Sequence, residues 1–111
     1  MNNGISERDW RIFRELQPVA EERLCEKVLA ELRGILDSGE GTARERYRRL
    51  LELADTRNEE LGNAFDDFRR STALAQIGII HSMRLFTGEE LRRFSPETLQ
   101  FVEVYGPIPP E

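Results

Sequence analysis

Two side chains of this sequence could together carry out nucleophilic chemistry, the single cysteine, Cys25, and the single histidine, His81. A thiol becomes a strong nucleophile when a neighbouring imidazole takes its proton. However, Cys25 lies beside an apolar stripe, where free cysteine is commonly buried as a small hydrophobic residue. His81 follows Leu74 and Ile77 at helical spacing, which is typical of a core or interface histidine. We therefore expect no catalytic pair.

Metal and phosphate sites are not predicted either. A structural zinc site needs about four Cys or His ligands, and this chain has one of each. Di-iron bundles use Glu-x-x-His pairs, but the residue three before His81 is Gly78. Glu22 and Glu26 are one turn apart, but basic residues alternate with them, as on a solvated face. There is no glycine-rich phosphate loop, and we expect no cofactor.

The charge balance argues against a nucleic-acid partner or an anionic membrane surface. The chain has 16 basic and 21 acidic residues, a net charge of −5, whereas nucleic-acid binding needs a basic surface. Residues 71–94 could be drawn as a helix-turn-helix that turns at Thr87-Gly88. The N-terminal end of a recognition helix makes the base contacts. Here that end would be Glu89 and Glu90, which repel phosphates. The arginine-rich run 44–49 is interpreted as a solvated face.

The length of the chain and its cysteine content limit the classes of protein to which it can belong. A chain of 111 residues is enough for one domain, which we expect over 1–105, with a proline-rich tail at 106–111. No apolar run reaches the length of a membrane span, and the first nine residues do not resemble a secretory signal. A lone cysteine fits a reducing cytoplasm. All but one of the bases are arginine, as codon bias in a GC-rich bacterial genome would produce.

The first predicted helix runs from Ser6, a plausible N-cap, to about Leu36. Its apolar residues recur every three or four positions, as expected of a helix with one buried side; they are Phe13, Leu16, Ala20, Leu24, Val28, Leu32 and Ile35. Pro18 either kinks this helix or splits it in two. Because the stripe keeps its phase through the proline, we favour a kinked continuous helix.

A second helix is predicted from Ala43 to about Arg69, since Thr42 and Glu45 form a capping box before it. Its apolar stripe comprises Tyr47, Leu50, Leu51, Ala54, Leu61, Phe65 and Phe68. The stretch 55–60 is wholly polar, so the helix either passes beyond the core or is interrupted there. Asn58 falls on the stripe and could set the register of a helix pair; the alternative is a solvent-facing residue.

The third predicted helix, at 71–83, contains no charged residue. This length suits a helix buried on most sides. Small residues on one face, Ala75, Gly78 and Ser82, would let another helix approach closely, and His81 lies on the neighbouring face. These four are the candidate helix-packing or interface residues. Two short helices follow, one capped by Thr87 and ending near Phe94, the other capped by Ser95 and ending near Val104.

These elements predict an all-α fold, in which a long antiparallel helix pair packs with a central uncharged helix and two short C-terminal helices. The two long helices would each measure roughly 40–45 Å. This is long for a compact chain of this size, whose radius of gyration should be ~13 Å. We therefore expect a non-enzymatic cytoplasmic protein that acts through protein–protein contact, as a homodimer. The alternatives are a small-ligand or catalytic pocket near His81, Cys25 and Trp10, and a helix-turn-helix nucleic-acid binder.

Overall fold

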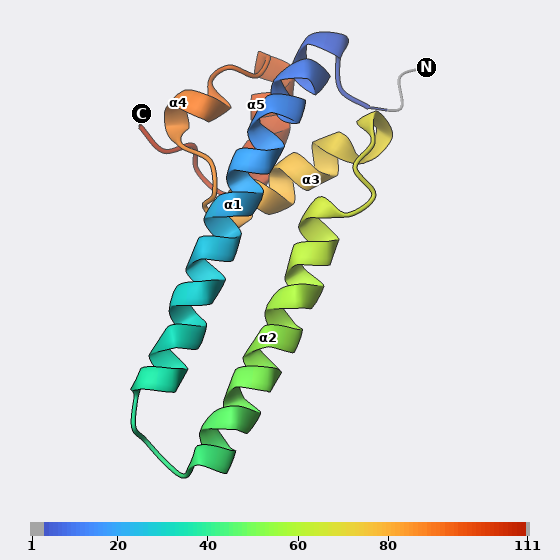
Figure 1. Ribbon diagram of the computed structural model, residues 1–111. Coiled ribbons are helices and arrows are strands. Elements are labelled where there is room, and N and C mark those ends of the chain that lie inside the picture. Colours follow the sequence, from blue (N-terminus) through green and yellow to red (C-terminus); the bar gives the residue numbers. More distant parts are fainter. Residues whose placement is uncertain (1–3, 111) are drawn as a thin grey trace.

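The protein is entirely helical over the part of the chain that its computed structural model describes, residues 4–110. Expectations about Met1–Asn3 and Glu111 lie outside this range. The helices are α1 (Glu7–Asp37), α2 (Ala43–Phe65), α3 (Arg70–Ser82), α4 (Gly88–Leu91) and α5 (Pro96–Val102), followed by a 3₁₀ turn at Glu103–Tyr105. The all-α prediction is thus confirmed, with a long helix pair and three shorter helices (Figure 1).

Helices α1 and α2 form an antiparallel hairpin, and α1 is continuous through Pro18. The side-chain oxygen of Ser6 caps α1 by accepting a hydrogen bond from the amide of Asp9 at 3.1 Å. Pro18 and Arg14 are both exposed. The carbonyl of Arg14, which the proline leaves without a helical donor, therefore lies on the solvent side of α1. This position makes the proline tolerable inside a long helix.

Helix α2 is shorter than predicted, since it ends at Phe65 and not near Arg69. The chain turns at Asp67, which has a φ of 56° in the left-handed region, and the side-chain amide of Gln76 donates to the carbonyl of Asp66. Phe68 consequently leaves the α2 stripe and packs on Trp10, with ring centroids 5.0 Å apart. The polar stretch 55–60 does not interrupt α2.

Helix α3 lies at the centre of one end of the molecule, where it packs against α1, α2, α5 and the 3₁₀ turn. Its buried residues are Ala73, Gln76, Ile77, Gly78, Ile80 and His81. The capping box at Thr87 and the Ser95 cap form as predicted. Both following helices are shorter than predicted, because α4 makes a single turn and α5 passes into the 3₁₀ turn after Val102.

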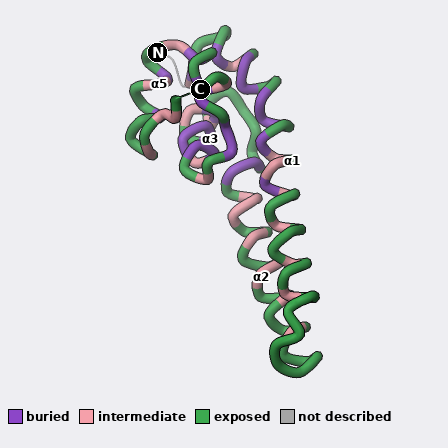
Figure 2. Tube along the Cα trace, turned by 90° about the vertical axis from the view of Figure 1, so that its left-hand side faces the viewer, coloured by how far each residue is buried: buried purple, intermediate pink, exposed green. Residues whose placement is uncertain are grey.

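The hydrophobic core occupies only this one end of the molecule (Figure 2). Every residue of the core belongs to 4–24 or 61–110, which we call the head. Residues 25–60 form the projecting hairpin, which extends beyond the head and contains no fully buried residue. The molecule measures 56 × 29 × 22 Å, and its radius of gyration is 16.6 Å, above the ~13 Å of a compact domain of about this size.

Candidate interaction face

One side of the projecting hairpin carries large apolar side chains that face solvent. Leu29 and Leu36 of α1 are 64% and 61% exposed, and Tyr47 and Leu51 of α2 are 64% and 45% exposed. Leu29 and Leu36 are seven residues apart, and Tyr47 and Leu51 four, so each pair lies along one side of its helix. A single exposed leucine is ordinary, but four large apolar residues on one side of a hairpin form an exposed apolar patch.

A groove of about 340 Å³ runs between the two helices on the same side. It is lined by Cys25, Val28, Leu29, Ala54, Arg57, Asn58 and Leu61. Asn58 is exposed, and its side chain makes no hydrogen bond to any other residue that the structure describes. We call Cys25, Leu29, Leu36, Tyr47, Leu51, Ala54 and Asn58 together the apolar face. It joins the candidate register residue, Asn58, to the exposed leucines.

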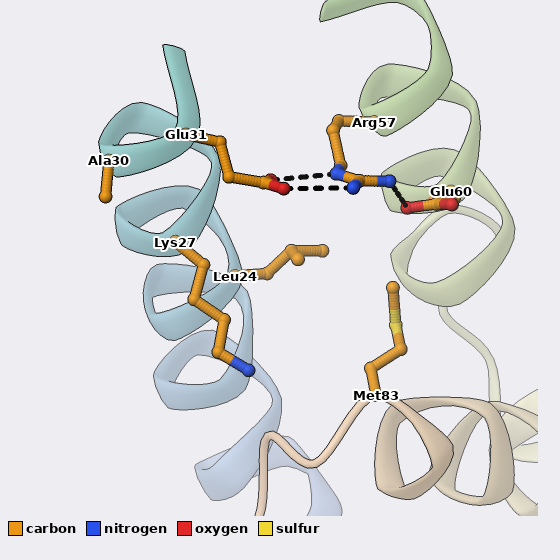
Figure 3. A pocket seen from close by; sticks show the side chains of 7 residues that line it. All are labelled: Leu24, Lys27, Ala30, Glu31, Arg57, Glu60 and Met83. Atoms are coloured by element: carbon orange, nitrogen blue, oxygen red, sulfur yellow. Dashed lines mark hydrogen bonds and ion pairs between the residues drawn. The ribbon is translucent and has the colours of Figure 1, made fainter. Parts of the chain in front are cut away.

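Ion pairs cross between the two helices on the opposite side of the hairpin (Figure 3). Arg57 of α2 donates two hydrogen bonds to Glu31 of α1, at 2.9 and 3.0 Å, and a third to Glu60 at 3.0 Å. Hydrogen bonds from Arg57 lower the pKa of Glu31 below its ordinary value. These groups rim a pocket of about 510 Å³ with Lys27 and Met83 beside it. The hairpin therefore has one ion-paired side and one apolar side.

Of the three small residues predicted on one face of α3, only Gly78 lies under another part of the chain. The ring of Tyr105 lies on Gly78 so closely that a Cβ at this glycine would overlap it. Ala75 and Ser82 are exposed. His81 is buried, and its Nε2 donates to the carbonyl oxygen of Gly106 at 3.0 Å, whereas its Nδ1 is buried and has no hydrogen-bond partner among the described residues.

The groups proposed for a catalytic or ligand pocket lie in three different surroundings. Trp10 packs on aromatic residues of the head, His81 lies under the C-terminal segment, and Cys25 lines the hairpin groove. Burial, and then the charge of Glu21 and Glu22, raise the pKa of the Cys25 thiol. This shift keeps the thiol protonated, which is the opposite of what a nucleophile needs.

The sequence did not reveal the buried carboxylate of Asp9, which its pattern places in the first turn of a helix, where negative charge suits the helix dipole. Asp9 is completely buried and accepts three hydrogen bonds, from the amide and hydroxyl of Ser95 at 3.0 and 2.6 Å and from the hydroxyl of Thr98 at 2.6 Å. It ties the first turn of α1 to the first turn of α5. No sequence signal links residues this far apart, so spacing could not have revealed the contact.

Over the described residues, the structure gives little support for a metal site, a helix-turn-helix or a membrane span. Within residues 4–110, no group of three Cys, His, Asp or Glu side chains could hold a metal ion. The predicted second helix of a helix-turn-helix is the single turn of α4, followed by a non-helical turn. Among the described helices, none is both long and apolar enough to cross a bilayer.

Comparison of this chain with models of protein families, with curated proteins and with solved structures finds no match in any of the three.

Proposed function

We propose that this protein is a non-enzymatic helical protein that acts through protein–protein contact, and that it forms a homodimer through the apolar face of its projecting hairpin. The observation that carries the proposal is the exposure of Leu29, Leu36, Tyr47 and Leu51 on one side of a hairpin that no other part of the described chain covers. Helices in proteins derive most of their stability from packing an apolar side.

The shape of the molecule supports the same proposal. A hairpin that only had to close the head would need no residues beyond its contact with α3 at Met83, yet α1 and α2 continue to the turn at residues 38–42. Two hairpins packed face to face would make a four-helix bundle with a continuous core, a common solution for amphipathic helix pairs. A homodimer supplies the second pair without another gene product.

Sedimentation velocity or light scattering across the micromolar range tests this proposal. We expect twice the chain mass of 12.9 kDa for the wild type. Leu36→Glu should give the monomer mass, because the substitution places an unpaired carboxylate in the apolar interface. The matched control is Ala30→Glu, which adds the same charge to an exposed position of α1 that lines the ion-paired side; it should leave the dimer intact. A wild type that is monomeric throughout this range contradicts the proposal.

A further inference from the structure

The charges along α2 are divided between its two halves. Residues 43–50 carry four arginines and one glutamate, whereas residues 51–60 carry one arginine and four acidic residues. This order is the reverse of what the helix dipole favours, since acidic groups stabilise the first turn of a helix and basic groups the last. The stability of α2 in one chain therefore does not account for the arrangement.

Four of these charged residues border the apolar face. Arg44 and Arg48 line a shallow pocket together with Tyr47 and Leu51, and Asp55 and Glu59 continue the same row four and eight residues beyond Leu51. All four are exposed. None of them forms an ion pair with another residue of the described range.

Within this row, like charges are neighbours. Arg44 and Arg48 are like charges one turn apart, and so are Asp55 and Glu59, and such pairs destabilise an isolated helix. The row thus presents a basic segment and an acidic segment of equal length, on either side of Leu51. A surface of this kind is complementary to itself when one copy is reversed.

We propose that a second copy of this chain packs on the apolar face in antiparallel orientation, with Arg44 and Arg48 of each protomer facing Glu59 and Asp55 of its partner around a two-fold axis near Leu51. This inference rests on the proposed function and adds the orientation of the two copies and the residues that select it. In a two-fold interface each contact occurs twice, so the arrangement makes four ion pairs from residues that have none in the monomer.

The length of the projecting hairpin is compatible with the register that the charges set. When Arg44 lies opposite Glu59, Thr42 at the tip of one hairpin lies opposite Leu61 of the other, where the head begins. Each hairpin then covers the other along about 28 Å, and the heads lie at opposite ends without meeting. The ion pair between Glu31 and Arg57 fixes the level of α1 against α2, and it brings Leu36 to the height of Leu51 at the two-fold axis.

The area of this contact is sufficient for a specific dimer. Two adjacent helices present a face about 20 Å wide, so an overlap of about 28 Å covers roughly 560 Å² on each protomer. The total of about 1,100 Å² exceeds the roughly 1,000 Å² that a biological interface needs and lies just below the range of about 1,200–2,000 Å² of most stable ones. At this size the charged rim has a large influence on which orientation forms. In a parallel dimer α2 would lie over α1 of the partner, and the four rim residues would never meet.

Charge reversal tests the orientation. The double variant Arg44→Glu/Arg48→Glu makes the rim wholly acidic, and Asp55→Arg/Glu59→Arg makes it wholly basic; each should weaken self-association by at least about tenfold at low salt, because four attractive pairs become repulsive. The fourfold variant that combines them restores every pair in an antiparallel dimer and has the net charge of the wild type. It should self-associate within about threefold of the wild type. The matched control, Arg8→Glu/Arg11→Glu, reverses two exposed arginines of the head and should change nothing.

The outcomes separate this inference from the proposed function. A wild type that never dimerises removes both. A wild-type dimer that Leu36→Glu dissociates, but that the fourfold variant does not restore, keeps the homodimer and overturns the antiparallel orientation. A dimer that neither double variant weakens overturns it as well. Because the substituted positions are exposed, we expect each variant to keep its helices. Circular dichroism of each variant checks this.

Discussion

The ring of Tyr105 packs directly on Gly78, in the middle of α3, and this contact lets the C-terminal segment lie close to the helix. Any side chain at this position would have to push the ring away, because Cδ1, Cε1 and Cζ of Tyr105 all lie within reach of a Cβ there. The conformational cost of a glycine inside a helix, about 1 kcal/mol relative to alanine, is thus offset by the close approach that it permits.

Gly78→Ala should therefore destabilise the protein although alanine is the better helix former. We expect a net loss of up to about 2 kcal/mol in the free energy of unfolding, because the overpacking cost of about 1–3 kcal/mol is on balance larger than the gain in helix propensity of about 1 kcal/mol. Urea unfolding measures this change. In a Tyr105→Ala background the same substitution should become neutral or stabilising, and an equal loss in both backgrounds would show that the ring is not the cause.

Removal of the Asp9 carboxylate should destabilise the head. Asp9→Ala leaves the amide and hydroxyl of Ser95 and the hydroxyl of Thr98 without their acceptor, and we expect a loss of about 2–4 kcal/mol. Glu7→Ala is the matched control, since Glu7 lies in the same turn but is exposed and bonds only to the exposed Arg70. If both variants cost the same in urea unfolding, the buried carboxylate does not stabilise the head.

Acid should weaken the contact between α1 and α4. Arg23 donates to both carboxylate oxygens of Glu90, at 2.7 and 3.0 Å, and these hydrogen bonds lower the pKa of Glu90 below its ordinary value. A lowered carboxyl pKa stabilises the fold above the unfolded-state value of about 4.3, and this stabilisation is lost as the pH falls through the folded-state value.

Glu90→Gln should consequently be less stable than the wild type at neutral pH, and the difference should shrink as the medium is acidified below about pH 4. Thermal melts at a series of pH values measure it. Glu89→Gln, at an exposed neighbouring position, serves as the control and should show no such trend. A difference between Glu90→Gln and the wild type that does not depend on pH would contradict the role of the ion pair.

The ion pair between Glu31 and Arg57 should hold the projecting hairpin closed. Arg57→Ala removes the bonds to Glu31 and Glu60, and we expect faster amide hydrogen exchange over residues 25–60 with little change in the head. Arg57→Lys keeps the charge but not the paired hydrogen bonds, and it should give an intermediate rate. Equal exchange in all three proteins would mean that the apolar contacts alone close the hairpin.

The Cys25 thiol should react slowly with alkylating reagents. Its raised pKa leaves a smaller thiolate fraction at a given pH than in a free cysteine, and the thiolate is the reactive form. Iodoacetamide labelling followed by mass spectrometry should show a slower rate than for a cysteine peptide, and a pH midpoint shifted upward. Denaturation should abolish the difference. A faster rate in the folded protein would contradict the shielded position of this side chain.

Local signals in the sequence were sufficient to predict the caps at which four of the helices begin. Ser6, Thr42, Thr87 and Ser95 all cap as expected, because a capping hydrogen bond joins residues three apart. The prediction that the long helices exceed a compact domain also follows from length alone, and the extended shape agrees with it.

The sequence was less informative where contacts are distant along the chain. The end of α2 at Phe65 depends on Gln76, ten residues later than the carbonyl that it binds. The partner of Gly78 is Tyr105, in a turn that no helical periodicity places. The exposure of Leu36 and Leu51 could not be predicted either, since a stripe indicates which side of a helix is apolar but not how far the core extends.

The clasp between Asp9 and α5 has a consequence for the order in which the chain folds during synthesis. The hairpin contains only contacts between neighbouring segments and can form once α2 has emerged, whereas the head needs Thr98 to meet Asp9. At 5–20 residues per second, ribosomes need about 2–7 s to make the stretch from the end of α2 to Thr98. During that interval Phe13 and Leu16 of the nascent chain lack their final packing partners, so the protein is most prone to aggregation before the head is complete.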